Sequence, residues 1–320
     1  MKKIHSLPAT VMMPLSDIVE KRPALLVTSS PAWKAVKDRL HLNIAGQVEV
    51  LEANTAHWDT LLATVADLYY EIIYAVGGGL VVDAAKYFAA ILHLPLAALP
   101  TALSVDAFLT AASGIRRDGC VYYIETNPPD NLILDLNVIA AAPDSIRAAG
   151  ITDVMSIATG SWDWKFAHQR GQNPPGMEFI PWVYDNAQSI LAGVLDCAEA
   201  AGRGDQDGLK TLYDCLAMEV QLCNQIGHAR PEEGSEHYFA YSVENLIGHG
   251  LPHGNLVGPG IMIMAQIQGQ ATGRLEKALK ACNIPLDHIP AEVTDRTLRA
   301  LPVYCTQHGL PFGIAHTWRG

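Results

Sequence analysis

Apolar stretches of strand length alternate with stretches of helical spacing through the first part of the chain. The strand-like stretches are residues 24–28, 47–52, 72–76 and 96–99. Residues 58–70 and 80–93 instead carry apolar side chains three and four positions apart, as helices do. Strands that alternate with helices form parallel β-α-β units, because the chain returns to the next parallel strand through a helix. The sequence therefore predicts an α/β fold with a doubly wound parallel sheet.

A change of texture near residue 142 indicates a second domain. Pro143 and Asp144 are typical of a helix start, and the sequence beyond them is rich in alanine and leucine at helical spacing. A chain of 320 residues also favours about two domains. We therefore expect an α/β nucleotide-binding domain over residues 1–142 and an all-helical, metal-binding domain over residues 143–320.

Charge and cysteine content argue against several classes of protein. Acidic residues outnumber basic ones by 33 to 22, which gives a formal charge of −11 and opposes nucleic acid or an anionic membrane surface as a partner. No uninterrupted apolar run approaches ~18 residues, so we expect no membrane span. The six cysteines form no C-x-x-C pair and are expected to be buried, reduced thiols. Reduced thiols indicate a cytoplasmic protein.

Three consecutive glycines follow the strand-like stretch 72–76 and precede the helical stretch 80–93. Such a turn binds phosphates, because glycines allow close approach and the N–H groups of the helix start meet the negative charge. The spacing is not G-x-G-x-x-G, and a tight turn without a ligand explains it equally well. Asp83 and Lys86, three positions apart, are interpreted from spacing alone as a solvated ion pair.

Three segments supply candidate metal ligands: Gly150 to Asp153, Gly234 to His237, and His253 to Gly260. One carboxylate and two imidazoles leave coordination positions open, as catalytic Zn²⁺ or Fe²⁺ sites do. Each residue has a commoner role, because an aspartate near a helix start is usually a cap and a lone histidine is usually hydrogen-bonded within the protein. From composition alone, His168, His228 and His249 compete equally for this role.

Six motifs in this order together resemble the iron-containing alcohol dehydrogenase superfamily, and within it the sn-glycerol-1-phosphate dehydrogenase branch. The motifs are GGGLVVDAAK (77–86), PTALSVDAF (100–108), AGITDVMS (149–156), SWDWKFA (161–167), RPEEGSEHYF (230–239) and HGNLVGPG (253–260). The resemblance runs from about residue 72 to residue 262. It implies the two-domain architecture shared with dehydroquinate synthase, which agrees with the periodicity of the chain.

The resemblance also implies roles for individual residues. It assigns Asp153, His237 and His253 to the metal, and it makes Asp106 and Asp153 the catalytic residues that hold substrate hydroxyls. Tyr241 takes a substrate-facing place where the family usually has a second histidine. The residues that the resemblance assigns to the cofactor are Gly77, Gly78, Gly79, Leu80, Val81, Val82, Asp83, Thr101, Ser104 and Thr110.

The activity that the resemblance implies is the reduction of dihydroxyacetone phosphate to sn-glycerol-1-phosphate by NAD(H) or NADP(H). It also implies one divalent metal ion, for which zinc is the first candidate. We expect a homo-oligomer that acts on a phosphorylated triose. Lys165 or Arg230 is a candidate for attracting the phosphate, and each is equally interpreted as a solvated surface group. The first strand ends in Thr28-Ser29 without the family's ribose-binding acid, which leaves NADP(H) open.

Two other activities remain alternatives at this point. Tyr241 in place of a histidine favours a related polyol, glycerol or aldehyde dehydrogenase of the same superfamily. A lyase similar to dehydroquinate synthase would recycle its nicotinamide, but Asp153, where those synthases have glutamate, counts against it, as does the DWK motif.

Overall fold

The computed structural model describes residues 4–319, so residues 1–3 and 320 of the predicted domain ranges lie outside the described residues. The chain divides into two compact units. One comprises His5–Arg117 and Val121–Arg147, and the other comprises Asp118–Cys120 and the chain from Ala148 onward. The sequence placed the boundary near residue 142, and the contacts divide the chain after Arg147.

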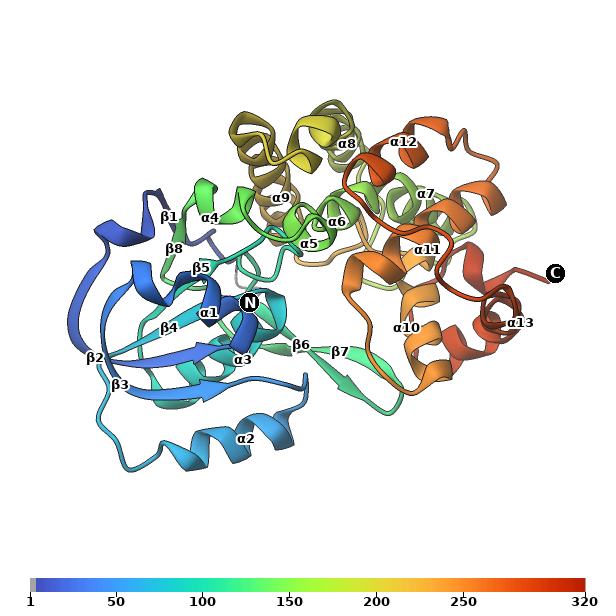
Figure 1. Ribbon diagram of the computed structural model, residues 1–320. Helices are drawn as coiled ribbons and strands as arrows, with labels where there is room; N and C mark the ends of the chain where they lie inside the picture. Colours follow the sequence, from blue (N-terminus) through green and yellow to red (C-terminus); the bar gives the residue numbers. More distant parts are fainter. Residues whose placement is uncertain (1–3, 320) are drawn as a thin grey trace. The chain divides into compact units, whose positions relative to one another are not determined.

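The first unit is built on a parallel sheet in the order β1-β8-β5-β4-β2-β3 (Figure 1). Its strands are β1 (Ala9–Met12), β2 (Val19–Thr28), β3 (His41–Glu49), β4 (Ile72–Gly77), β5 (Leu96–Pro100) and β8 (Asn131–Leu134). A separate pair, β6 (Ala112–Arg117) and β7 (Cys120–Glu125), forms a two-stranded sheet. All residues of β4 and β5 are buried, which explains their continuous apolar sequences. The predicted α/β fold with a parallel sheet is confirmed.

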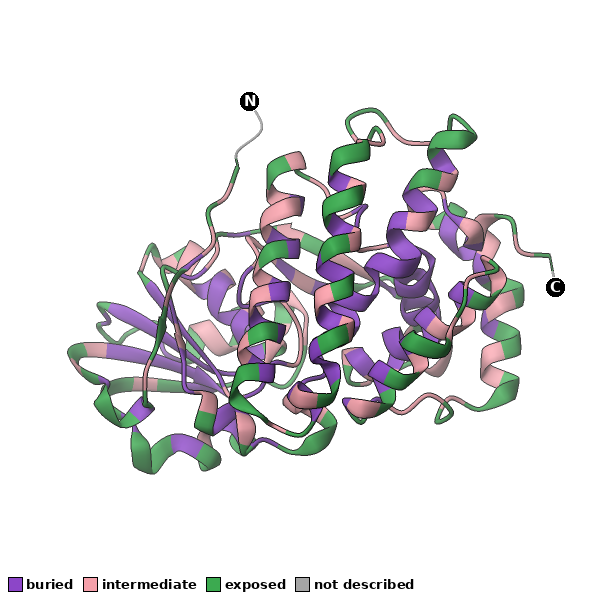
Figure 2. Ribbon diagram, turned by 90° about the horizontal axis from the view of Figure 1, so that it is seen from above, coloured by how far each residue is buried: buried purple, intermediate pink, exposed green. Residues whose placement is uncertain are grey.

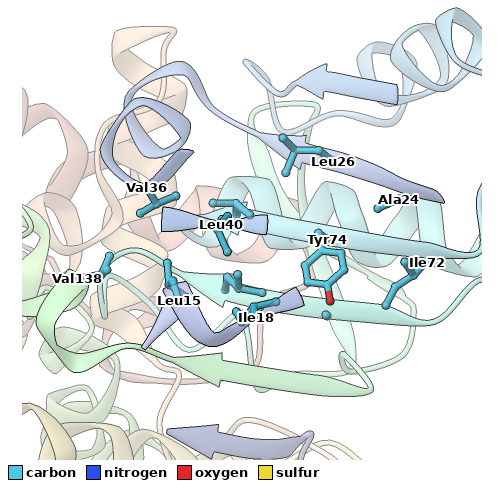
Figure 3. Packing of buried hydrophobic residues seen from close by; sticks show 12 residues of the cluster. Leu15, Ile18, Ala24, Leu26, Val36, Leu40, Ile72, Tyr74 and Val138 are labelled. Carbon is cyan, nitrogen blue, oxygen red and sulfur yellow. The ribbon is translucent and has the colours of Figure 1, made fainter. Parts of the chain in front are cut away.

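The first unit also contains helices, and the side chains of its strands alternate between the two faces of the sheet. The helical elements are η1 (Leu15–Asp17), α1 (Ser30–Val36), η2 (Lys37–Arg39), α2 (Thr55–Thr64), α3 (Gly79–Leu92), α4 (Leu136–Ala140) and α5 (Asp144–Arg147). Ala24 and Leu26 of β2 and Ile72 and Tyr74 of β4 project into one core, two positions apart as strand geometry requires (Figure 3). The intervening Leu25 and the other residues between them are equally buried on the opposite face.

The helix predicted over residues 58–70 is wrong at its C-terminal end, because α2 stops at Thr64. The cap residue Val65 leaves the helical conformation, and the Tyr70 hydroxyl donates to the Val65 carbonyl at 3.2 Å. A side-chain hydroxyl from the following segment thus takes the carbonyl that the next helical turn would have used.

The strand order reverses between β2 and β4, because the chain moves outward from β2 to β3 and then in the other direction from β4 to β5 and β8. In open parallel sheets, ligands bind beyond the carboxyl ends of the strands at such a switch point. Thr28 ends β2 and Gly77 ends β4, and the Thr28 hydroxyl donates to the Val76 carbonyl at 2.7 Å. The glycine turn therefore lies at the place where this fold forms a ligand crevice.

The second unit is helical, and the described residues from Ala148 onward contain no strand, which confirms the predicted helical domain. Figure 2 shows these helices with buried residues on one side and exposed residues on the other. Its elements are α6 (Ile151–Met155), α7 (Ile157–Gln169), α8 (Pro181–Gly202), α9 (Gln206–Ile226), α10 (Ser235–Ile247), α11 (His253–Ile267), α12 (Gly273–Ala281), α13 (Ala291–Gln307) and η3 (Ile314–His316). No helix in the described part of the chain has the length and apolar character needed to span a membrane.

Candidate metal and nucleotide sites

The helical unit brings the three predicted metal ligands together. Asp153 lies on α6, His237 on α10 and His253 at the start of α11, and one donor atom from each lies within 4.8 Å of the others. His253 Nε2 lies 3.2 Å from Asp153 Oδ1, and the two imidazole centroids are 5.2 Å apart. Asp153 and His237 are buried, whereas the His253 side chain is 28% exposed.

Close helix packing makes this convergence possible. A Cβ on Gly260 would lie only 2.6 Å from the Glu236 carbonyl oxygen, so the glycine allows α11 to pass against the first turn of α10. His237 lies in that first turn and His253 is the first residue of α11. Gly260 of the HGNLVGPG motif therefore allows the close helix contact that brings the two histidines near each other.

The electrostatic environment of the three donors is negative. Burial alone lowers the pKa of His237, but its hydrogen bond to Glu236 and the charges of Glu236, Glu233 and Asp153 outweigh this and raise the pKa to about 9. The centre therefore favours a positive charge. One carboxylate and two imidazoles fit a single divalent cation with open coordination positions.

The competing histidines have other roles. His228 Nδ1 accepts from the Arg230 N–H at 3.3 Å, and its ring packs edge-on against Trp164. His168 stacks on Phe179, and the exposed His249 follows the end of α10. Among the described residues, Asp153, His237 and His253 form the one group with metal-ligand spacing. Their assignment as ligands stays a prediction.

Tyr241 lies beside the metal candidates. Its side chain is buried, its hydroxyl donates to Glu233 Oε1 at 3.0 Å, and its ring centroid is 6.0 Å from that of His237. The residue in the expected substrate-facing position is thus bound to a carboxylate. Sequence reasoning missed Glu233 and also Glu236, although both stand in the RPEEGSEHYF motif.

The DWK motif has a structural explanation in the same unit. Asp163 of α7 accepts hydrogen bonds from the Ser235 N–H at 2.8 Å, the Ser235 hydroxyl, Gln268 Nε2 at 3.2 Å and the Ile314 N–H at 2.8 Å. One carboxylate therefore joins α7 to the start of α10, to the end of α11 and to the C-terminal segment.

The interpretation of Arg230 as a solvated surface group is wrong. The residue is 2% exposed, and its guanidinium donates to the Phe312 carbonyl at 2.8 Å. Arg230 therefore ties the GSEH segment to the C-terminal segment. Lys165 remains exposed, with its ammonium 5.0 Å from the centre of the Tyr184 ring.

The α/β unit groups several of the predicted cofactor residues at the carboxyl end of β4. The Thr101 N–H donates to the Gly77 carbonyl at 3.4 Å, and a Cβ on Gly78 would lie 3.2 Å from the Ser104 hydroxyl oxygen. A Cβ on Gly79 would overlap the Val105 side chain. The glycines are therefore needed for close contact between the turn and residues 101–105, whether or not a nucleotide is bound.

Other predicted cofactor residues face into the protein. Val81 and Val82 are buried, and their N–H groups donate to the Gly78 carbonyl at 3.0 and 3.2 Å. Leu80, at the first turn of α3, is 36% exposed. The N–H groups of the helix start are the ones left for a phosphate, as at any helix N-terminus.

The interpretation of Asp83 and Lys86 as a solvated pair is wrong. The Lys86 side chain is 0% exposed, and its ammonium lies 2.9 Å from Asp83 Oδ1. It also donates to the Ala107 carbonyl at 2.9 Å, to the Thr110 hydroxyl at 3.1 Å and to the Ala112 carbonyl. Lys86 therefore fixes residues 101–111, the connection between β5 and β6.

Asp83, Thr110 and Asp106 have different surroundings within this unit. Asp83 also accepts from the Gly114 N–H at 3.2 Å, and the Thr110 hydroxyl lies among the partners of Lys86, so both side chains support the connection. Asp106 is half-buried on the same connection and its carbonyl accepts from the Leu109 N–H at 2.7 Å. The functional roles of these residues stay predictions.

Comparison with known proteins identifies the family. A family model for iron-containing alcohol dehydrogenase matches residues 12–143. The glycerol-1-phosphate dehydrogenase [NAD(P)+] of Sulfurisphaera tokodaii is 30% identical over 268 residues, which are 82% of this chain and 75% of that protein. The chain belongs to the iron-containing alcohol dehydrogenase superfamily. The glycerol-1-phosphate dehydrogenase [NAD(P)+] of Pyrococcus horikoshii is 27% identical and covers 81% of this chain and 73% of its own length.

Solved structures show the same fold. A probable glycerol dehydrogenase from Sinorhizobium meliloti 1021 has a TM-score of 0.70 at 18% identity, covering 94% of this chain and 90% of that one. Sulfoacetaldehyde reductase from Bifidobacterium kashiwanohense, solved with NAD⁺, has a TM-score of 0.65 at 15% identity, covering 92% and 91%. The predictions of the superfamily, of its two-domain fold and of a nicotinamide-dependent dehydrogenase are confirmed.

Proposed function

We propose that this chain reduces dihydroxyacetone phosphate to sn-glycerol-1-phosphate with NADH or NADPH. Asp153, His237 and His253 hold one divalent cation, for which zinc is the first candidate. The convergence of these three donors, far apart in the sequence and within 4.8 Å in the structure, carries the proposal. The names of the relatives from Sulfurisphaera tokodaii and Pyrococcus horikoshii support the choice of substrate.

NAD(P)H would supply the hydride for the carbonyl carbon of the substrate, and a proton from solvent would add to the carbonyl oxygen. The products are the alcohol and NAD(P)⁺. A divalent cation supplies Lewis-acid stabilisation of the negative charge that develops on a substrate oxygen. The start of α3 beside Gly78 and Gly79 binds the pyrophosphate, Asp106 orients a substrate hydroxyl, and Thr101 and Ser104 contact the nucleotide.

Two further properties belong to the same proposal. All six cysteines are buried and none forms a disulfide, which supports a reducing compartment such as the cytoplasm. A homo-oligomer stays a prediction, and sedimentation velocity of the purified protein measures it.

Metal analysis and one substitution test the proposed metal centre. Protein purified without chelators should contain about one zinc or other divalent ion per chain. His253→Ala should lose the metal and the turnover together, because one of three donors is removed. His249→Ala is the matched control, since this exposed histidine lies outside the group. An active, metal-free His253→Ala protein would refute the proposal.

A polyol, glycerol or aldehyde dehydrogenase activity is the second candidate. It is favoured by Tyr241 and by its partner Glu233, whose carboxylate opposes a phosphate group nearby. Rates with dihydroxyacetone phosphate should therefore be compared with those for dihydroxyacetone, glycerol and simple aldehydes, from nicotinamide absorbance. Equal rates with and without the phosphate favour the second candidate. An enzyme that turns over substrate without net change of nicotinamide would instead be a lyase.

A further inference from the structure

Glu236 occupies a fully buried position beside one predicted metal ligand. Its Oε1 lies 2.9 Å from His237 Nδ1 and accepts from the Gly234 N–H at 2.6 Å. Its Oε2 accepts from the Thr159 hydroxyl at 2.7 Å. Glu236 and Thr159 are both 0% exposed. Two donors other than the imidazole therefore hold the carboxylate in place.

This arrangement determines which nitrogen of His237 is available. An ionised carboxylate only accepts hydrogen bonds, so His237 Nδ1 must carry the proton that Glu236 receives. In the neutral imidazole, the form that binds a cation, the lone pair then lies on Nε2. A carboxylate that orients a histidine in this way favours the required tautomer and increases the basicity of the ligand.

We propose that Glu236, itself held by Thr159, is the positioning residue that aims His237 at the cation. Neighbouring side chains on a helix do not normally face one another. Here the contact forms because Glu236 lies in the first turn of α10 and turns back to the Gly234 N–H, where α7 supplies the Thr159 hydroxyl. The inference rests on the proposed metal centre.

Zinc affinity tests this role without requiring turnover. Competition with a chromophoric chelator should show Glu236→Ala binding zinc about 10–100-fold more weakly than the unsubstituted protein. Glu236→Gln keeps an acceptor for His237 and should lose less. Because a buried alanine can impair folding, Thr159→Val provides a milder change that removes one donor, and Thr159→Ser should restore the affinity.

Glu233→Gln is the matched control, because it removes a nearby negative charge without touching His237 Nδ1. The inference is overturned if Glu236→Ala binds zinc within twofold of the unsubstituted protein. It is also overturned if Glu233→Gln loses as much zinc affinity as Glu236→Ala does. In either case the proposed metal centre stands. If the unsubstituted protein binds no divalent metal, the metal centre and this inference fail together.

A separate observation in the α/β unit concerns the choice of nucleotide. β2 ends in Thr28 and has no acid at its carboxyl end, but Glu49 at the end of β3 pairs in register with Thr28. Its Oε1 accepts from the Ser30 N–H at 2.8 Å. A carboxylate from the adjacent strand thus lies against the residues that follow β2.

We infer that Glu49 makes the chain prefer NAD(H) over NADP(H). An acid near the strand ends at the switch point accepts the ribose hydroxyls and repels a 2′-phosphate. The hydrogen bond from the Ser30 N–H holds the Glu49 carboxylate beside the residues that follow β2. This inference rests on the proposed nucleotide site.

Binding measured by nicotinamide fluorescence tests the preference on the purified protein. NADH should bind at least about tenfold more tightly than NADPH, and Glu49→Gln should tighten NADPH binding by about tenfold. Glu52→Gln, at an exposed acid that pairs with Asn54, is the matched control and should leave the ratio unchanged. Equal affinities, or a ratio that Glu49→Gln does not alter, overturn the inference alone. Failure to bind either nucleotide overturns the nucleotide site as well.

Discussion

Lys86→Met should destabilise the α/β unit, because the buried lysine ammonium bonds α3 to the connection between β5 and β6. Methionine has a similar length and no donor. The substitution leaves the Asp83 carboxylate, whose side chain is 15% exposed, without its counter-charge at 2.9 Å. It also removes the donor to the Ala107 carbonyl at 2.9 Å. Residues 101–111, which carry the predicted nucleotide contacts Thr101 and Ser104, then lose their anchor to α3.

The size of the effect follows from these contacts. Breaking a buried ion pair by removing one partner costs about 3–5 kcal/mol. Asp83 keeps the Gly114 N–H at 3.2 Å and some exposure to solvent, so we expect the lower end, about 3 kcal/mol. Lys210→Met is the control: its pair with Asp214 is 42% and 45% exposed, and such surface pairs contribute roughly 0.2–1 kcal/mol.

The dependence on pH adds a second criterion. Burial raises the pKa of Asp83, and the Lys86 charge opposes this rise. A carboxyl with a raised pKa in the folded state loses its contribution to stability as the pH rises through that pKa. Removing Lys86 raises the pKa further, so Lys86→Met should be less destabilised at pH 5 than at pH 8.

Urea unfolding at both pH values measures the stability, and hydrogen exchange of peptides covering residues 101–116 measures the local opening. Lys86→Met together with Asp83→Asn should be more stable than Lys86→Met alone, because the unpaired carboxylate is gone. The reasoning is refuted if Lys86→Met loses less than about 1 kcal/mol, the contribution expected of a solvated pair, or if exchange of the 101–116 peptides is unchanged.

Three further outcomes are expected. Gly79→Ala should weaken nucleotide binding about tenfold or more with normal metal content, because the added Cβ overlaps Val105; unchanged affinity in a titration would contradict this. Burial raises the pKa of Asp163 from 3.8 to about 6. The protonated carboxyl therefore contributes roughly 3 kcal/mol to stability below pH 3.8, and this contribution is lost as the pH rises through 6. Asp163→Asn should remove that slope from urea titrations between these values, and a persistent slope would assign it elsewhere. Burial raises the pKa of Cys197 and Cys282 to about 12, so iodoacetamide at pH 8 should label these thiols only after denaturation; rapid labelling of the native protein would argue against their burial.

The sequence by itself determined the fold class and the chemistry of the candidate sites. Strand and helix periodicity restricts how apolar faces can be buried, and residues 72–93 specify a strand, a glycine turn and a helix that meet at the proposed nucleotide site. The motifs around Asp153, His237 and His253 supplied donors of the right type. Composition alone could not separate them from His168, His228 and His249.

Only the tertiary structure decided which of these groups meet and which are buried. The three-residue spacing of Asp83 and Lys86 is the same for a surface pair and for a buried pair, and the connection over residues 101–111 decides between them. Arg230 is likewise internal, and its guanidinium donates to the carbonyl of Phe312, 82 residues away along the chain. Burial and contact depend on residues far away along the chain, whereas periodicity and spacing describe only near neighbours. Long-range packing therefore gave these side chains their roles.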